Sequence, residues 1–503
     1  MRADIRKQTE SRSYNVDTPG WVPLAMLAAG LLLGIWGAYS LLAGGGSQSV
    51  AFYALAGWFV VLAIGYLALQ NQDRLAWYSI PALLTFEGLL EFICIPVWRF
   101  ATGADVIDSV YVHAMTLTLL GFSAFWIGSL ISKREARMRF VPQMQDTSDR
   151  VVFMSGAMLV LGVIGNVLIW KLGLSLYLNT TDKAGLHDSY LPLMGWLTFC
   201  SGLLQAAMIV SAIEVLGKQS PAPLIRLIFW LSVVSMIGFG LISGMKSAPL
   251  FPLLYLVLIY RITRGRIPRI GFVIPLLLLP IYPLVTAYRA NLNTGYSAQA
   301  NSLGGLEAVL GKSFVDAFNS PLSTSDLGGS AVDQAEGRLN LLTDVHDIIG
   351  LPDPSLLNGD EKIWLAPIYP LVPRALWKNK PVFDKGVRLS IVLGRASTTS
   401  SAPTQIGDLY SLFGTSGVVI GMLVYGLCVQ LYMNRVSGAL SERVLFFYIS
   451  MLTPMIDLEQ DSVALVGTLV QTGITLLVMS YVIYGRPDSP PHIGRHLPST
   501  RTI

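Results

Sequence analysis

The residues of this chain best suited to bind an anion lie between positions 362 and 395. This stretch contains seven basic residues and one acidic residue, Asp384. The basic residues are Lys362, Arg374, Lys378, Lys380, Lys385, Arg388 and Arg395. Four prolines and Trp377 lie among them and stiffen the backbone, so the cations suit a phosphate group in a defined position. A planar guanidinium contacts two phosphate oxygens at once, which favours the arginines. The alternative is a solvated basic face or a patch that meets lipid headgroups.

A candidate proton-transfer residue, His346, lies in the preceding acidic stretch, residues 290–361. Residues 331–350 predict a helix, because apolar side chains recur there at helical spacing: Leu339, Leu342, Val345 and Ile349. Arg338 and His346 fall on the edges of this apolar stripe, whereas Asp344 and Asp347 fall on the opposite side. Partial burial suits a histidine or arginine for proton transfer or phosphate binding. The alternative is a structural histidine satisfied by its neighbours.

The composition indicates that these residues are positioned by membrane helices. The chain has 503 residues, of which 53% are hydrophobic and only 13% are charged, whereas soluble domains carry about 25% charged residues. Its three cysteines lie in apolar runs, so neither a disulfide nor a metal site is indicated. This composition excludes a disordered chain, a collagen-like chain and a disulfide-stapled scaffold.

Apolar runs long enough to span a bilayer predict an all-α polytopic membrane protein with about twelve transmembrane helices. The predicted spans are 21–43, 50–69, 77–97, 110–131, 151–173, 190–216, 224–242, 247–262, 270–288, 411–433, 440–456 and 463–484. The chain therefore divides into an N-terminal tail (1–20), nine helices (21–288), a large loop (289–409), three helices (410–484) and a C-terminal tail (485–503). We expect the first span to be retained, because no cleavage site follows it.

The basic residues predict which side of the membrane each connection occupies. With the N-terminus in the cytoplasm, 21 of the 35 basic residues lie in the cytoplasmic tails and connections, as the positive-inside rule requires. Both termini are then cytoplasmic, and the loop 289–409 lies on the outer side. A loop of about 120 residues is unusual unless it is functional.

Several ionisable residues within or beside the spans are further candidates. Glu87 and Glu91 lie one helical turn apart on the third span, as a structural pair or as an acidic wall of a substrate cavity. Arg99 and His113 are expected to point toward the same cavity. Lys246 lies in a tight outer connection beside small residues, where its ammonium can approach a phosphate. Three acidic residues form an outer turn between the last two spans: Asp457, Glu459 and Asp461.

Motifs for other kinds of chemistry are missing from the sequence. It has no Asp-x-Asp metal motif of nucleotide-sugar enzymes, no phosphate loop with Lys-Ser/Thr and no His-Glu-x-x-His zinc motif. Since the outer side offers no nucleotide sugars or ATP, synthetic chemistry there needs a donor activated beforehand and delivered through the lipid. A lipid diphosphate fits this requirement.

Three motifs in the second half of the chain carry a family resemblance. The first is Gly244-Met245-Lys246-Ser247, followed by Tyr288-Arg289 at the end of the next outward span. The second is residues 372–381, VPRALWKNKP, and the third is residues 405–414, QIGDLYSLFG. Together they resemble the Wzy-type oligosaccharide repeat-unit polymerases of bacterial O-antigen and exopolysaccharide synthesis, which are related to the O-antigen ligases. The motifs extend over residues 243–426, and the likeness of topology extends over the whole chain. Lys246 stands where the family commonly has arginine, and an ammonium binds phosphate only as a point charge.

The resemblance implies a glycosyltransferase with a GT-C-like fold in the bacterial inner membrane, its large loop in the periplasm. It implies transfer of a growing glycan from undecaprenyl diphosphate to a hydroxyl of the next lipid-linked unit, without a cofactor or metal. The expected partners are this lipid-linked glycan, membrane lipid, a chain-length regulator and a flippase, and no nucleic acid. The diphosphate would be held by cations: Lys246, Arg289, Arg338, Arg374, Lys380 and Arg388. His346 or Asp408 would act as the base, and Glu87 and Glu91 would line the cavity.

Two other functions share part of this pattern. A ligase, which joins finished glycan to a lipid core, has the same topology and an arginine-rich loop. A flippase moves the lipid-linked unit without making bonds, and its site is expected near the middle of the membrane. The long outer loop argues against the flippase.

Overall fold

The structure is a computed structural model. It describes residues 79–101, 105–131, 139–140, 148–172, 184–244, 248–265, 303–319, 340–372, 385–395, 401–436 and 439–485, with short pieces between them. The predicted spans 21–43 and 50–69, and most of 270–288, lie outside these residues. So do both predicted tails, apart from Gly485.

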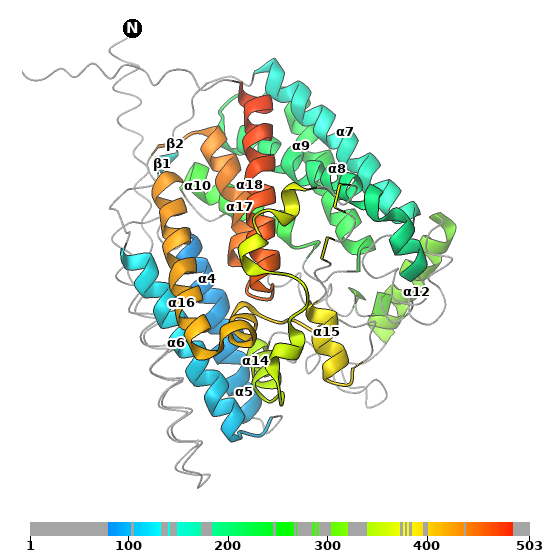
Figure 1. Cartoon of the computed structure of the whole chain (residues 1–503). Coiled ribbons are helices and arrows are strands. Elements are labelled where there is room, and N and C mark those ends of the chain that lie inside the picture. Colours follow the sequence, from blue (N-terminus) through cyan, green and yellow to red (C-terminus); the bar gives the residue numbers. More distant parts are fainter. Residues whose placement is uncertain are drawn as a thin grey trace, which may run out of the picture.

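The described residues form a bundle of helices (Figure 1). In chain order these are α4 (Ile80–Leu89), the π-helical turn η2 (Leu90–Cys94), α5 (Ile95–Ala101), α6 (Ser109–Ile131), α7 (Asp149–Lys171), α8 (Ala184–Gly217), α9 (Pro223–Ile242), α10 (Phe251–Arg264), α16 (Gln405–Val436), α17 (Glu442–Ile456) and α18 (Ser462–Tyr484). A two-residue parallel bridge joins β1 (Arg139–Phe140) to β2 (Ala439–Leu440).

Six of the described helices are long and apolar enough to cross a membrane: α6, α7, α8 from Gly195 onward, α9, α16 and α18. Large apolar side chains are exposed on them, including Phe153 at 69% and Trp230 at 61%, a surface that lipid covers and water does not favour. The protein is therefore an all-α, multi-pass membrane protein. Helices also occupy the predicted spans 77–97, 247–262 and 440–456, but α10 has only 14 residues.

Helices α6 and α16 pack closely because glycines lie at their contact. A Cβ added to Gly128 of α6 would collide with the carbonyl oxygen of Leu423, and one added to Gly426 of α16 with that of Phe125. The hydroxyl of Ser129 also donates to the carbonyl of Gly426 at 3.3 Å. Small residues that let two backbones approach are the usual means of packing membrane helices.

Helix α16 begins at Gln405, before the predicted loop boundary at residue 409, and changes direction at Gly414. This glycine has φ 65° and ψ −156°, which no helical residue adopts. Residues 405–413 therefore form a separate short helix, and the kink at Gly414 falls inside the predicted span 411–433 (Figure 1). The sequence predicts the span but not the kink.

One end of the bundle carries the folded part of the loop, and we call it the loop end (Figure 1). The elements of the loop are α12 (Leu303–Asn319), α14 (Leu341–Ile349), the 3-10 turns η5 (Pro354–Leu357), η6 (Ile363–Leu365) and η7 (Tyr369–Leu371), and α15 (Lys385–Val392). Residues of η6 and η7 pack against the first turns of α18. Ile348, Leu357 and Leu389 form a small core that joins α14, η5 and α15. The bridge of β1 and β2 lies at the opposite end.

The helix predicted for residues 331–350 is shorter in the structure, because α14 begins at Leu341. Asn340 has non-helical backbone angles, and its side chain accepts a hydrogen bond from the N–H of Thr343, so it caps the helix. Ile348 is the buried residue of the last turn, whereas Ile349 is half-buried. Arg338 and the other residues of 331–339 lie outside the described part.

Candidate functional site

Lys385 and Asp408 form a buried ion pair that joins the loop to the bundle. Lys385 lies on α15 and Asp408 in the first turn of α16, and their side chains are 2% and 0% exposed. The ammonium of Lys385 donates to Asp408 and, at 2.8 Å, to the amide oxygen of Asn358. The other carboxylate oxygen of Asp408 accepts from the backbone N–H of Ser462 at 2.8 Å. Asp408 therefore connects α15, α16 and α18, and with both oxygens engaged it is poorly placed to take a proton from a substrate.

Arg388, on the same face of α15 as Lys385, forms an ion pair with Glu361. The two side chains are 20% and 6% exposed. Gly359 adjoins this pair, where a Cβ would collide with the guanidinium. Burial lowers the pKa of Arg388, while Asp461 and Asp360 oppose the change. A guanidinium stays charged in proteins, so Arg388 is a cation that a bound anion would share with Glu361.

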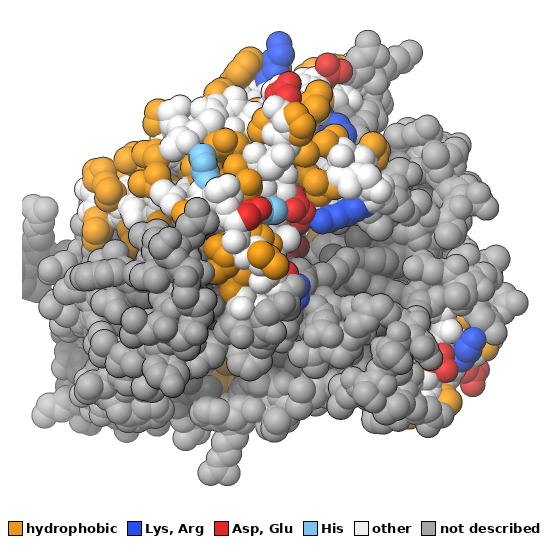
Figure 2. Space-filling view, turned by 90° about the horizontal axis from the view of Figure 1, so that it is seen from below, with side chains coloured by type: hydrophobic (Ala, Val, Ile, Leu, Met, Phe, Trp, Pro, Cys, Tyr) orange, Lys and Arg blue, Asp and Glu red, His pale blue; other side chains and the backbone are white. Residues whose placement is uncertain are grey.

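His346 of α14 lies between two carboxylates. Its ring stacks on Tyr111 of α6, with centroids 3.9 Å apart. Nδ1 lies 3.2 Å from Asp347 and Nε2 lies 3.3 Å from Asp108, and Arg395 donates to the other oxygen of Asp347 at 2.8 Å. The hydrogen bond to Asp347 raises the pKa of His346, burial opposes this, and Asp108 adds to the increase. Figure 2 views the loop end and shows acidic, basic and histidine side chains side by side on it.

The contacts with Asp347 and Asp108 fix the orientation of the His346 ring. One of its nitrogens is held by Asp347, as in other sites where a carboxylate orients an imidazole. The side chain of Asp108 is 51% exposed, so its rotation into solvent would free Nε2 for a substrate hydroxyl. The sequence placed Asp347 on the side of α14 away from the protein, and this was wrong, because its side chain is 18% exposed and bound on both sides.

The connection between α5 and α6 holds α14 in place. Arg99 donates to both oxygens of Asp105, at 2.7 and 2.9 Å, and Asn340 donates to Asp105 at 3.2 Å. Arg99 is therefore engaged by Asp105. His113 is exposed and contacts the ring of Tyr410 edge-on. These contacts do not place either residue in a cavity with the glutamates of the third span.

Glu87 and Glu91 lie beside the acidic turn between α17 and α18. One carboxylate oxygen of each glutamate is buried without a hydrogen-bond partner among the described residues. Asp457 and Glu459 are close enough to repel both of them. The two glutamates therefore lie close to this acidic turn, and neither lines the cavity described below.

The acidic turn is itself ordered by hydrogen bonds. Asp457 accepts from the N–H of Glu459 at 3.1 Å and from the side chain of Gln460 at 2.7 Å. Asp461 caps α18 by accepting from the N–H of Ala464 at 2.7 Å. Gln405, which opens the third motif, donates to the carbonyl of Asp457 at 2.8 Å. Burial raises the pKa values of Asp457 and Asp461.

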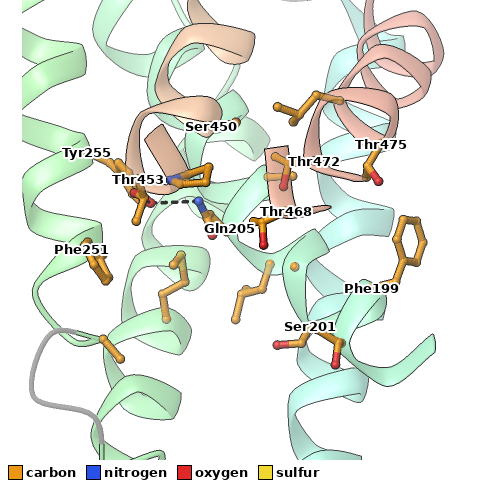
Figure 3. A pocket seen from close by; sticks show the side chains of 18 of the residues that line it. Phe199, Ser201, Gln205, Phe251, Tyr255, Ser450, Thr453, Thr468, Thr472 and Thr475 are labelled. Atoms are coloured by element: carbon orange, nitrogen blue, oxygen red, sulfur yellow. Dashed lines mark hydrogen bonds between the residues drawn. The ribbon is translucent and has the colours of Figure 1, made fainter. Parts of the chain in front are cut away.

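A cavity of about 580 Å³ lies inside the bundle (Figure 3), within the size range of small-molecule sites. Helices α8, α9, α10, α17 and α18 form its walls, and Asn166 of α7 adds to them. Its polar lining consists largely of hydroxyl and amide groups: Asn166, Thr198, Ser201, Gln205, Ser243, Tyr255, Ser450, Thr453, Gln460, Thr468, Gln471, Thr472 and Thr475. Asp457 and Gln460 belong to the acidic turn, so the cavity reaches the loop end.

Several of the polar groups in the cavity wall bond to one another. Gln205 donates to the hydroxyl of Tyr255 at 3.0 Å, and the hydroxyls of Tyr255 and Thr453 share a hydrogen bond. Ser201 donates to Asn166 at 2.9 Å. These bonds join α8 to α7 and, through α10, to α17.

The sequence carries an uncharged signal for this cavity on the last span. Thr468, Gln471, Thr472 and Thr475 recur at helical spacing along the last span and so lie on one face of α18. A polar stripe on a membrane helix has to face a partner or a cavity rather than lipid.

The other predicted site residues are only partly placed. Lys380 donates to the carbonyl oxygen of Val372 at 3.1 Å, so two residues of the second motif contact each other. Lys246, Arg289, Arg338 and Arg374 lie outside the described residues. Within the described part, no group of three or more metal-ligating side chains is placed to hold an ion.

Comparison with known protein families gives a match to part of the chain. A family model described as a domain of unknown function, DUF8712, matches residues 360–441. This stretch contains the second and third motifs, α15 and α16. No curated protein and no solved structure matches the chain.

Proposed function

We propose that this protein is a polymerase that joins undecaprenyl-diphosphate-linked oligosaccharide repeat units into O-antigen or exopolysaccharide. The proposal is carried by one observation: a cavity lined by hydroxyl and amide groups reaches the end of the membrane bundle on which the cation-bearing loop is folded. The motifs at 372–381 and 405–414 add the family resemblance. An enzyme that acts on a soluble sugar donor does not need a membrane bundle, whereas an enzyme that acts on a lipid-linked donor does.

The topology belongs to the same proposal. The chain would have twelve spans with both termini in the cytoplasm of a bacterium, and the loop end would face outward from the inner membrane. The ends assigned to the cytoplasm lie together: Arg150 donates to the carbonyl of Val482, and Arg264 to that of Lys218. Such contacts support alternation of the helices across the membrane.

The reaction would take place at the loop end. A hydroxyl of the acceptor unit attacks the anomeric carbon of the donor glycan, a carbon–oxygen bond forms, and the bond from that carbon to the diphosphate breaks. The diphosphate leaves with the electron pair, and His346 accepts the hydroxyl proton, oriented by Asp347. We favour His346 over Asp408, because Lys385 and Ser462 already occupy the carboxylate of Asp408.

The departing diphosphate gains negative charge as its bond to the sugar breaks, and nearby cations stabilise this charge. We assign this role to Arg388, Arg289, Arg374 and Lys246, with Arg338 and Lys380 behind them. Arg388 can exchange part of its contact with Glu361 for the diphosphate. A cationic cradle of this kind stabilises the leaving group electrostatically.

The test is deletion of the gene, followed by analysis of the length of the surface polysaccharide. The proposal expects single-repeat products in the deletion strain and restored long chains with the wild-type protein. Arg374→Ala should behave like the deletion while the protein is still inserted in the membrane. Long chains that accumulate on the carrier lipid would instead identify a ligase, and unchanged polysaccharide would exclude both enzymes.

A further inference from the structure

The cavity presents polar surfaces from two sides at membrane depth. On α18, Thr468, Gln471, Thr472 and Thr475 follow one face, and on α8 Thr198, Ser201 and Gln205 do the same. Figure 3 shows threonines of α18 and the Gln205 and Ser201 side chains of α8 around the same space. Polar groups in the hydrocarbon region are stable only when they are hydrogen-bonded, so the cavity is built for polar contents.

Two groups that line the cavity have capacity to bind a ligand. The hydroxyl oxygen of Ser450 and the amide oxygen of Gln460 are buried and have no hydrogen-bond partner among the described residues. Ser450 is 7% exposed. An orphaned buried polar atom costs free energy, and a ligand with hydroxyl groups would supply the missing partner.

The charge of the cavity decides between classes of ligand. Asp457 is the one acidic residue among those that line it, and no lysine or arginine is among them in the described part. A diphosphate would find no cation there, and an isoprenoid tail would leave the two polar faces unpaired. A neutral sugar matches both features, because its hydroxyls can both donate and accept and its C–H faces pack on aromatic rings such as Phe199, Phe251 and Tyr255.

We propose that this cavity binds uncharged sugar residues of the glycan while the diphosphate remains at the loop end. The inference rests on the proposed polymerase function and names the part of its substrate that this site takes. The hydroxyl and amide faces of α8 and α18 then determine which sugar units fit. The Gln205–Tyr255–Thr453 contacts hold the α8, α10 and α17 walls together.

Filling the cavity is the most direct test. Gly202 of α8 lines the cavity, and a Cβ added to it meets no atom within 4 Å, so Gly202→Leu fills space without a backbone collision. Gly473 of α18 has the same free space but does not line the cavity, which makes Gly473→Leu the matched control. We expect Gly202→Leu to reduce long-chain polymer about tenfold or more, as small changes of pocket volume do, and Gly473→Leu to leave it unchanged.

The second test removes single threonine hydroxyls from the cavity wall, with little change in the volume of the side chain. Thr472→Val and Thr475→Val should each reduce polymer formation about two- to tenfold, the value of one neutral hydrogen bond. Thr118→Val is the control, because this buried hydroxyl of α6 bonds only within its own helix and is not in the cavity wall. The amount of each variant in the membrane is measured by immunoblot.

Direct occupancy is measured with Thr472→Cys in a chain whose native cysteines are replaced by alanine. A small water-soluble thiol reagent should label Thr472→Cys in cells that make no lipid-linked repeat unit. Labelling should fall in cells that accumulate the single lipid-linked unit. Equal labelling in the two strains would mean that the cavity holds water only, and would overturn the inference.

The outcomes separate this inference from the proposed function. If deletion of the gene shortens the polysaccharide but Gly202→Leu and the valine variants retain wild-type lengths, the protein is a polymerase that binds sugars elsewhere. If deletion leaves the polysaccharide unchanged, the polymerase function itself is excluded.

Discussion

At the scale of single residues, the pair Lys385–Asp408 is the strongest link between the loop and the membrane bundle. Asp408→Ala would leave the buried ammonium of Lys385 with only Asn358 and would also remove the acceptor of the Ser462 N–H. Removing one partner of a buried pair typically costs about 3–5 kcal/mol. We expect a clear decrease in the Tm of the purified protein in detergent, measured by thermal unfolding.

A more exposed ion pair provides the comparison for Asp408→Ala. Arg395, whose side chain is 45% exposed, pairs with Asp347, and exposed pairs contribute about 0–1 kcal/mol. Arg395→Ala should therefore change Tm little. In the double variant Lys385→Met, Asp408→Leu, part of the lost stability should return, because no charge is left buried alone. Equal losses in Asp408→Ala and Arg395→Ala would mean that the buried pair is not a structural link.

His346 makes the stability of the protein depend on pH. Because its folded-state pKa is raised, its protonated form stabilises the fold, fully at pH values below the unfolded pKa of about 6.5. This stabilisation is lost as the pH rises through the folded pKa. We expect wild type to exceed His346→Gln in Tm by more at a pH of about 5.5 than at about 8.5. The groups that face the ring are Asp108, Asp347 and Tyr111.

Deprotonation of His346 should lower the stability of the protein but raise its activity. His346 can accept a proton only when it is neutral, so polymer formation should increase as the pH rises through the folded pKa, while the stabilisation decreases. Asp108→Asn removes one of the charges that raise this pKa and should shift the rise in activity to lower pH. An activity profile that is unchanged in Asp108→Asn would exclude His346 as the base.

At the scale of elements, several membrane helices were predictable and the features that shape the site were not. Apolar runs predicted helices at α6, α7, α9 and α18, because the bilayer requires long stretches without charge. The start of α14 depends on the cap at Asn340, and the kink of α16 on a backbone conformation of Gly414, and neither leaves a periodic signal.

The candidate site was predictable only in part, for a related reason. His346 was predicted from its place at the edge of an apolar stripe and Asp408 from the third motif, but the residues that contact them come largely from α15, α18 and the start of α6, far away in the sequence. Asp408, predicted as a candidate base, forms a buried ion pair that links the loop to the bundle. The α18 wall of the cavity consists of four threonine and glutamine residues. They carry no charge, and the sequence prediction rested on charged residues.

The kink in α16 should depend on Gly414 having no side chain. Its φ of 65° and ψ of −156° are open almost only to glycine, and an L-residue there costs about 1–3 kcal/mol. We expect Gly414→Ala to lower Tm and to reduce polymer formation, because the short helix 405–413 that carries Asp408 would be displaced. Gly473→Ala is the control: it lies in a regular helix with free space and should be neutral or slightly stabilising. Equal effects of the two variants would show that the kink is not required.

At the scale of the whole molecule, the bundle combines two kinds of contact. In the membrane, glycines let helices such as α6 and α16 touch, and few charged groups are used. At the loop end, ion pairs and caps join segments that are far apart in the sequence, including α15, α16 and α18 through Asp408. As a result, closely packed helices surround the cavity, and the charged side chains are concentrated at the loop end. In the proposed function, the diphosphate binds at this end.

The orientation of the molecule in the membrane can be tested with two single cysteines in a chain whose native cysteines are replaced. Leu356 of the loop end is 59% exposed, and Gln219, between α8 and α9 at the opposite end, is also exposed. Because positive residues favour the cytoplasm, we expect a membrane-impermeant maleimide to label Leu356→Cys in intact cells and Gln219→Cys only after permeabilisation. The reverse pattern would place the loop on the cytoplasmic side, where a donor carried on the outer leaflet could not reach it, and polymerisation at the outer face would be excluded.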